Sequence, residues 1–541
     1  MARSILLLLV VTLIFCIPAA AFDGDPEGAG PAATGGEKGQ AEVLFEIRGF
    51  AVEGNTLLHE ENLREVLKAF IGREKTADDV EQARDALEGY YHDIGFPTVL
   101  VNLPEQVVED GVIRLQVIES RVAKVTVTGN RYYTAERILR DLPSLRIGGV
   151  LFAPEVQKQL NRVNRTRGLK VSPSIIPGQE LGAVNVELRV EDELPLHGSL
   201  EMNNRYTQGT TPLRVNGMLS YENLWQRGHS ISAQYQVAPM DIDEVQVVAG
   251  SYVLPAPWRD EDSIVLYGLY SDSGAAFGSG FQTFGRGLML GSRYVVPLPP
   301  YQRYSHNVTL GVDYKDFTDT VGSPSEGQDE ETPIAYLPLS VAYSAALPDD
   351  WGGVTQFSAH LKMAFRGLVT DQSQFEVKRY RATGNFLVTT LGMERAQELP
   401  AGMGLFARLD GQIADQPLIN NEQYVAGGMT NVRGYLEAEV LGDNGFHGSA
   451  ELSFPDPVTL LGRTDWLTTT PYLFCDLAFL GLRDPLPGQQ SSFTLQGTGI
   501  GIKGLLGKQV QFELNWGVAV RDGISTTEGT HRLYFRLQYQ F

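Results

Sequence analysis

The segment Val510-Gln-Phe-Glu-Leu-Asn-Trp-Gly-Val518, close to the end of the chain, decides the fold. Its even-numbered positions are all apolar, whereas its odd-numbered positions carry Gln, Glu, Asn and Gly. A period of two places alternate side chains on opposite faces of a β-strand. The last segment repeats the pattern, with apolar residues at every second position from Leu533 to the C-terminal barrel residue Phe541. Soluble sandwiches and membrane barrels share this alternation, so it leaves the environment open.

The number and length of such segments favour a membrane barrel. From residue 196 to residue 541 we find about sixteen candidate strands of ~9 to 14 residues, an even number with lengths suited to tilted membrane strands. The tenth is expected to start near Lys378. Connections such as Gln226 to Gly228 are short, whereas Asp319 to Thr332 and Asp415 to Phe446 are long and fall on the other side. We therefore predict an all-β, 16-stranded transmembrane barrel over 196–541, wide enough for an aqueous channel.

An internal repeat precedes the barrel. The pair Gly54-Asn55 recurs as Gly129-Asn130, an offset of 75 residues (129 − 54). In each copy a strand ends at this pair, where glycine makes a turn with positive φ cheap, and two helical patterns follow. Further strand patterns close each unit. The sequence therefore predicts two tandem α+β units of βααββ order, over 44–120 and 121–192.

The N-terminus has the order of a secretory signal peptide. Arg3 is followed by an apolar run from Ile5 to Ile17 and by Pro18-Ala-Ala-Ala21, so residues 1–21 are predicted to be removed by cleavage after Ala21. The following stretch, 22–43, is mainly Gly-, Ala- and Pro-rich and acidic, and it lacks an apolar period. It is predicted to be a disordered linker.

Composition disfavours several classes of protein. No stretch after the signal peptide reaches the ~18 apolar residues of a membrane-spanning helix. The net charge of −21 argues against a nucleic-acid partner. Cys475 is the one cysteine of the predicted mature chain, so no intramolecular disulfide is expected. The histidines lack metal-ligand spacing, and the literal Gly499-x-Gly501-x-x-Gly504 match lies in an alternating strand. We expect no cofactor, no metal and no enzymatic activity.

The motif Val432-Arg433-Gly434-Tyr435 follows the pair Gly427-Gly428. Together with the paired repeat and the barrel, it resembles the two-partner secretion transporters, the ShlB/FhaC/HecB-type haemolysin secretion and activation proteins. The resemblance covers residues 45–541. In that family the repeats are periplasmic POTRA domains, the barrel lies in the cell outer membrane, and the motif lies at the tip of the sixth outer loop, which folds back into the barrel. Strand counting also places the motif between strands eleven and twelve, the sixth outer connection.

The resemblance also implies a partner for Arg433. In the family a lumen-facing aspartate lies on strand thirteen in a Phe-x-Asp pattern, which Phe474-Cys475-Asp476 matches. Alternation independently leaves Asp476 pointing into the barrel. Breaking a bidentate arginine–carboxylate pair costs ~3 to 5 kcal/mol in a dry site and ~0 to 1 kcal/mol where water reaches it. Whether Arg433 only tethers the loop or takes part in transport stays open. Gly427-Gly428 is interpreted as a turn rather than a ligand cradle.

By resemblance, the POTRA domains recognise an unfolded, secreted exoprotein, and the barrel passes it to the cell surface or medium without nucleotide hydrolysis. Strand addition to a free sheet edge would supply the affinity; the alternative is that these domains are spacers. Outer-membrane lipid and the barrel-assembly machinery are the other expected partners. The family often has an N-terminal plug helix, but residues 22–41 show no helical pattern. The rival functions are an insertase of the same superfamily, which usually carries more POTRA units, and a passive porin.

Overall fold

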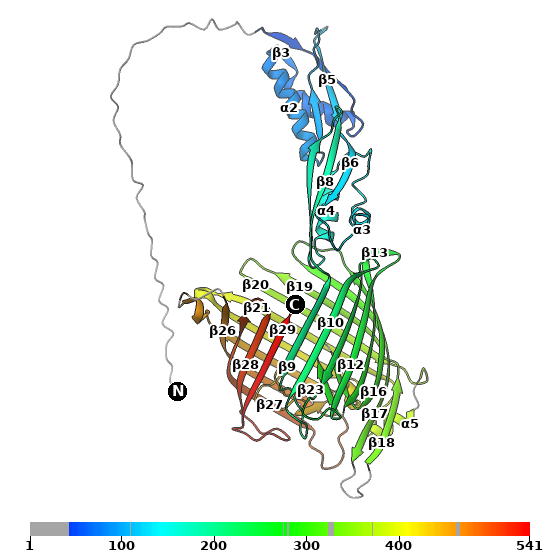
Figure 1. Ribbon diagram of the computed structural model, residues 1–541, viewed down its shortest axis with the longest axis vertical. Helices are drawn as coiled ribbons and strands as arrows, with labels where there is room; N and C mark the ends of the chain where they lie inside the picture. Colours follow the sequence, from blue (N-terminus) through cyan, green and yellow to red (C-terminus); the bar gives the residue numbers. More distant parts are fainter. Residues whose placement is uncertain are drawn as a thin grey trace, which may run out of the picture. The chain divides into compact units, whose positions relative to one another are not determined.

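A computed structural model describes residues 43–541 apart from 109, 274, 279–280, 323–328, 370–371, 461 and 463–465 (Figure 1). The predicted signal peptide and all but the last residue of the predicted linker lie outside these residues. The chain divides into two compact units, one up to Ile94 with Val99–Glu119, the other Gly95–Thr98 with Ser120–Phe541. No helix in the described part of the chain is long and apolar enough to span a membrane.

The first unit is an α+β domain built on a three-stranded sheet. Its elements are β1 (Phe45–Ile47), β2 (Gly49–Glu53), α1 (Glu60–Leu67), η1 (Lys68–Phe70), β3 (Gly72–Lys75), α2 (Ala77–Asp93), β4 (Val99–Asn102) and β5 (Val112–Glu119). The sheet order is β2-β5-β4, with β2 parallel and β4 antiparallel to β5. A capping box starts α2, because the Thr76 backbone N–H donates to Asp79 at 2.8 Å and the Asp79 N–H donates to Thr76. The Thr76 hydrogen bond lowers the pKa of the Asp79 carboxyl.

The second copy of the repeat has the βααββ order that β2, α1, α2, β4 and β5 have in the first. Its elements are β6 (Arg121–Thr128), α3 (Ala135–Asp141), α4 (Ala153–Val163), β7 (Leu169–Pro177) and β8 (Ala183–Asp192). The sheet order is β6-β8-β7, and Ile138, Leu160 and Leu188 belong to one buried core. The predicted βααββ order includes β7, but the sequence pattern does not locate it, because only its Leu169 and Val171 are buried and two prolines interrupt its alternation.

From Leu196 onward the chain forms a closed antiparallel barrel (Figure 1). β18 and β19 pair with successive parts of β17, so they are two halves of one strand interrupted at Leu337-Pro338. Counted in this way, the described residues form the sixteen strands that the sequence predicts. The last strand pairs with the first and closes the barrel. The strands are β9 (Leu196–Asn203), β10 (Arg214–Leu224), β11 (His229–Val237), β12 (Val245–Ala256), β13 (Arg259–Ser273), β16 (Arg286–Pro297), β17 (Ser305–Gly322), β18 (Asp329–Tyr336), β19 (Leu339–Pro348), β20 (Gly353–Ala364), β21 (Phe386–Leu399), β22 (Met403–Ala414), β25 (Asn444–Ser453), β26 (Leu467–Gly481), β27 (Ser492–Leu506), β28 (Val510–Ala519) and β29 (His531–Gln540).

The prediction that the tenth strand starts near Lys378 is wrong. That strand, β21, starts at Phe386, and residues Gln372–Lys378 form the helix α5. The alternate apolar residues Phe375 and Val377 suggest a strand, but Phe375 is buried and Val377 is 64% exposed. The Phe375 ring lies 5.7 Å from that of Tyr336, so tertiary packing selects the helix here.

The connection expected from Asp319 to Thr332 is also shorter than predicted. β17 continues to Gly322 and β18 begins at Asp329, and the two strands pair over this stretch. We predicted a loop here because the sequence is acidic and Gly-rich. The pairing of β17 with β18 is made by backbone hydrogen bonds, which amino-acid composition does not predict.

The outer surface of the barrel is apolar and carries tryptophans at one end. On β28, the outward residues Leu514 and Trp516 are exposed, while the inward residue Asn515 is buried. All five tryptophans are exposed, and four of them lie in or beside the turns on the side where β9 begins, which is the expected position at a membrane–water interface. These four are Trp225, Trp258, Trp351 and Trp466.

Candidate functional site in the barrel lumen

The connection between β22 and β25 folds back into the barrel. We call residues 415–443 loop six. It contains η3 (Asn420–Glu422) and the paired short strands β23 (Tyr424–Ala426) and β24 (Val440–Gly442). The predicted motif lies between these short strands, and the side chains of Val432 and Tyr435 are both fully buried. The tip of loop six is therefore packed inside the protein.

Arg433 binds Asp476 in the bidentate geometry expected of the pair. Its Nε and Nη2 donate to the two oxygens of Asp476, each at 2.7 Å, and its backbone N–H donates at 3.0 Å. Nη1 donates to Glu451 at 2.6 Å, and the guanidinium lies 3.7 Å from the centroid of the Phe474 ring. The side chains of Arg433 and Asp476 are 4% and 0% exposed, which makes this the dry form of the pair.

The two residues after Arg433 extend the anchor to the neighbouring strands. The Gly434 N–H donates to the hydroxyl of Tyr534 on β29 at 2.7 Å, and that hydroxyl donates to the Tyr435 carbonyl at 2.6 Å. The Tyr435 hydroxyl lies 3.0 Å from the Gln496 carbonyl and 2.7 Å from the Arg521 carbonyl. The motif therefore binds the wall from β25 round to β29.

Glycines on β27 and β28 make room for this tip, and sequence analysis did not assign them that role. A Cβ on Gly497 would lie 1.7 Å from the Arg433 carbonyl oxygen, and one on Gly517 would lie 2.8 Å from the Gly434 nitrogen. Gly499 and Gly501 face the rings of Phe474 and Tyr472. The glycine-rich sequence of β27 was the feature from which this role could have been inferred. Gly499 and Gly501, which belong to the literal match to the nucleotide-binding fingerprint, pack against aromatic rings instead of binding a nucleotide.

Gly427 and Gly428, which sequence analysis interpreted as a turn, lie at a bend directly after β23. Their φ angles are +104° and +112°, a region that glycine adopts without strain. A Cβ on Gly427 would lie 2.6 Å from the Leu436 carbonyl, and one on Gly428 would meet the Glu437 carboxylate at 2.5 Å. These glycines allow the two sides of the loop to approach each other.

Acidic residues hold the rest of loop six, and sequence analysis did not single them out. Glu437 pairs with Arg205 at 2.9 Å, next to the end of β9. Glu439 accepts from the backbone and hydroxyl of Thr526, and Asp443 pairs with Arg379 at 2.8 Å. Glu422 binds two lysines. The sequence feature that could have indicated these contacts was the high number of carboxylates in loop six, which the strand alternation had placed outside the membrane.

The predicted POTRA turns lie at equivalent places in the two copies of the repeat. Gly54 and Gly129 have φ angles of +83° and +84°. A Cβ on Gly54 would lie 2.3 Å from the Val117 carbonyl oxygen, and one on Gly129 would lie 2.4 Å from that of Val190. Both positions therefore require glycine for its backbone conformation and for space.

The asparagine of each turn holds the start of the following segment. Asn55 Oδ1 accepts from the Leu58 N–H and from the Tyr91 hydroxyl, and Asn130 Nδ2 donates to the Tyr133 carbonyl. Burial raises the pKa of Tyr91, and it raises the pKa of Tyr133 to about 12. These four turn residues have structural roles within their domains.

Phe541 ends the chain at the seam of the barrel. Its backbone N–H and carbonyl both bond Gly198 of β9 at 3.0 Å, and its ring is 51% exposed. A Cβ on Gly198 would meet this ring at 2.2 Å, so the phenyl group covers the glycine. The terminal residue thus continues the closing strand pair.

The chemistry of the lumen is that of ion pairs and hydrogen bonds. Among the described residues, no group of three or more His, Cys, Asp or Glu side chains could hold a metal ion. Buried carboxylates are matched by arginines, lysines or backbone N–H groups from the wall. This arrangement can hold loop six in one pose inside the barrel.

Two family models match the chain. One, described as "POTRA domain, ShlB-type", matches residues 45–120. The other, described as "Haemolysin secretion/activation protein ShlB/FhaC/HecB", matches residues 352–504, which include the motif of loop six and Asp476.

Similar proteins support these matches. Outer membrane transporter CdiB of Dickeya dadantii is 22% identical over 76% of this chain and 72% of its own length. Heme/hemopexin transporter protein HuxB of Haemophilus influenzae is 19% identical over 71% of this chain and 67% of its own.

Solved structures share the fold. CdiB from Escherichia coli has a TM-score of 0.64 at 18% identity and covers 94% of this chain and 92% of its own. BamA from Haemophilus ducreyi lacking POTRA domains 1–3 has a TM-score of 0.55 at 14% identity, covering 92% of this chain and 100% of its own. The barrel therefore lies in the outer membrane, the POTRA domains are periplasmic, and the chain serves the secretion of a partner protein. Over the matched residues the chain is similar to the outer-membrane transporters of the ShlB/FhaC/HecB haemolysin secretion/activation family.

Proposed function

We propose that the chain captures its partner exoprotein unfolded in the periplasm, through the first POTRA domain, and conducts it through the barrel without nucleotide hydrolysis or other catalysis. The single observation that carries the capture step is a free sheet edge beside an apolar groove. The exported protein folds outside, and folding there hinders its return. Outer-membrane lipid surrounds the barrel, and the barrel-assembly machinery inserts it.

The groove lies between β2 and α1. Among the described residues, β2 is an edge strand whose one ladder partner is β5. Residues 49–52 of β2 line the groove together with Leu63 and Leu67 of α1 and with Ile71. Glu60, Arg64 and Lys68 form its charged rim.

This geometry suits an extended peptide of variable sequence. The unpaired backbone groups of an edge strand can bond to an added strand whatever its side chains are. Alternate side chains of the peptide would enter the apolar groove, so a segment of alternating apolar residues is favoured. Such a segment is available only while the exoprotein is unfolded.

The groove is tested by replacing Ile71 with aspartate in the full chain. Ile71 is 44% exposed and lines the groove, so the substitution places a charge in the peptide site with little cost to the fold. The matched control is Leu100→Asp, which is also 44% exposed but lies on β4, the opposite edge of the same sheet. We expect Ile71→Asp to reduce export and the control to retain it. Equal export by both variants would refute capture at this groove.

The function as a whole is tested by mass spectrometry of culture supernatant and outer membrane from cells with and without the gene. Loss of one large exoprotein from the supernatant, restored by the wild-type gene, is the expected result. Depletion of many barrels from the membrane would point to an insertase instead. No change in either fraction would leave a passive porin as the better description.

A further inference from the structure

Loop six is held at several places on the barrel wall, and two of these attachments lie on different arcs. Its tip binds β25 and β26 through Arg433. Its beginning binds β17, β18 and β20 through Glu422. In the barrel order β21 and β22 lie between these two arcs. The motif at the tip explains the first attachment, and the second requires an explanation of its own.

The Glu422 carboxylate is bonded at both of its oxygens. Oε1 accepts from Lys315 Nζ at 2.5 Å and from the Tyr336 hydroxyl at 2.7 Å, and Oε2 accepts from Lys362 Nζ at 2.7 Å. Gln412 Nε2 donates to the Glu422 carbonyl at 3.0 Å. The glutamate side chain is 0% exposed, and those of Lys315 and Lys362 are 10% and 35% exposed.

The charges of this cluster make Glu422 hard to remove without a replacement. A single carboxylate bridges two ammonium groups on different strands. If the glutamate left alone, Lys315 would remain largely buried and facing Lys362 without the bridging anion. Leaving a buried charge without its partner is strongly unfavourable. Another carboxylate entering the same place would restore the balance.

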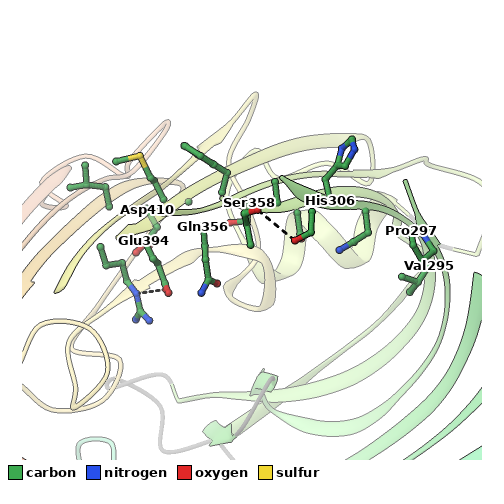
Figure 2. A pocket seen from close by; sticks show the side chains of 17 residues that line it. Val295, Pro297, His306, Gln356, Ser358, Glu394 and Asp410 are labelled. Atoms are coloured by element: carbon green, nitrogen blue, oxygen red, sulfur yellow. Dashed lines mark hydrogen bonds and ion pairs between the residues drawn. The ribbon is translucent and has the colours of Figure 1, made fainter. Parts of the chain in front are cut away.

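Two hollows lie along the wall of the barrel, and the second of them reaches this cluster. The first is lined by residues of β16 to β22 and includes Ser305, the first residue of β17. In Figure 2, which shows this hollow, Gln356 and Glu394 point to one side of the sheet and His306 to the other. This matches the strand register, which puts Gln356 and Glu394 on the same face.

The second hollow ends at the cluster itself. Asn421, Glu422 and Gln423 of loop six line it, together with Lys315 and Lys362. At a rise of ~3.3 Å per residue, Lys315 lies about 30 Å along β17 from Ser305. A chain that enters at the periplasmic end of this wall therefore meets Glu422 after it has crossed most of the barrel.

We propose that Glu422 is the gate residue of the pore, and that carboxylates of the exported chain open the gate by replacing Glu422 between Lys315 and Lys362. The proposal rests on the proposed function, because it takes an unfolded polypeptide as the substrate. Exchange of one carboxylate for another breaks no covalent bond and keeps both lysines paired. Loop six is then released on the β17–β20 side while Arg433 still holds its tip.

The test uses the purified full-length protein in planar lipid bilayers in potassium chloride. Glu422→Gln keeps the shape of the side chain and removes its charge. We expect an about tenfold rise in the ratio of open to closed time, the change that ~1.4 kcal/mol of lost latch energy produces. The matched control is Glu513→Gln. Glu513 pairs with the lumen residue Arg536 at 3.0 Å on β28 and β29, away from the Glu422 cluster. This control should record as wild type.

A second arm uses wild-type protein and three peptide probes added on the POTRA side. An unstructured peptide of alternating Gly and Glu should raise the open time, whereas Gly-Ser and Gly-Lys peptides of equal length should not. In Glu422→Gln the acidic peptide should act at a lower concentration than in wild type, because no carboxylate of loop six then competes for Lys315 and Lys362. Heat-modifiable mobility on SDS gels checks that each barrel is folded. The peptide experiment on the wild-type protein tests the proposal even if a variant does not fold.

The proposal is overturned if folded Glu422→Gln gates as wild type does, or if the three peptides act alike. Because the recordings contain no exoprotein, such a result refutes the role of Glu422 as a gate but does not test the proposed function. The proposed function is tested by the mass spectrometry of culture supernatants. Conversely, absence of any secreted partner in that experiment would refute the function even if Glu422 controls the current.

Discussion

Replacing Arg433 with alanine removes four side-chain hydrogen bonds, to Asp476, Glu451 and Ser449. The Asp476 side chain has no exposed surface, so the carboxylate loses its counter-ion without gaining water. Breaking a buried pair in this way costs ~3 to 5 kcal/mol. If this energy holds the tip of loop six in place, the docked population falls by about two to three and a half orders of magnitude relative to the released one.

The assay is the rate at which a thiol in the loop is labelled from outside the cell. Met429 is 5% exposed, so Met429→Cys in a Cys475→Ser background should react slowly with a membrane-impermeant maleimide while the loop is docked. Adding Arg433→Ala should raise the labelling rate by at least about a hundredfold, the factor that a loss of ~3 kcal/mol gives. The control is Arg536→Ala, whose side chain is 41% exposed and pairs with Glu513 on the wall.

The reasoning is refuted if Arg433→Ala leaves the labelling rate unchanged, because the ion pair then does not hold the tip. Export measured in the same cells separates the two roles of Arg433. A labelled, released loop with normal export would make Arg433 a tether alone. A released loop with lost export would make its position part of transport.

Three further substitutions follow from close contacts. Gly129→Ala puts a Cβ 2.4 Å from the Val190 carbonyl at a φ of +84° and should destabilise the second POTRA domain by about 1 to 3 kcal/mol, measured as faster proteolysis within that domain of the full-length protein. Gly497→Ala puts a Cβ 1.7 Å from the Arg433 carbonyl and should expel the loop tip, raising the labelling rate of the loop thiol. Tyr534→Phe removes the hydroxyl that joins the two backbone groups after Arg433, so it should weaken docking by about 1 to 3 kcal/mol and raise labelling less than Arg433→Ala does.

The two glycine predictions each have a matched control. Gly148 has a φ of +81°, and a Cβ added there would meet no atom within 4 Å, so Gly148→Ala separates backbone strain from the clash at Gly129. Gly217 lies on β10 in open space, and Gly217→Ala should leave loop labelling unchanged. Equal proteolysis of the two POTRA variants, or equal labelling of the two barrel variants, would contradict the role of steric contact.

The faces of the strands could be predicted from the sequence because alternation is local. Successive residues of a strand point to opposite sides whatever the rest of the chain does. Asp476 is buried and its neighbour Cys475 is exposed, as the alternation implied. The two Gly-Asn turns could be located for the same reason, since the positive φ at Gly54 and Gly129 is a property of a few neighbouring residues.

The helix α5 shows where local pattern fails. Over Gln372–Lys378 the apolar residues suit a strand as well as a helix, and the segment is too short for periodicity to decide. Its conformation depends on the pocket that receives Phe375, built by Tyr336 and Phe386 from other strands. Tertiary packing of this kind overrides local propensity.

By itself the sequence determined the barrel, its strand number, the repeat and the place of the motif, because each follows from a period or a spacing along one stretch of chain. Only the tertiary structure decided what holds loop six. Glu422 meets Lys315 and Lys362, which lie 107 and 60 residues away, and nothing in the pattern around any of the three reports the others. Closing the barrel brings them together, because pairing neighbouring strands places distant residues side by side.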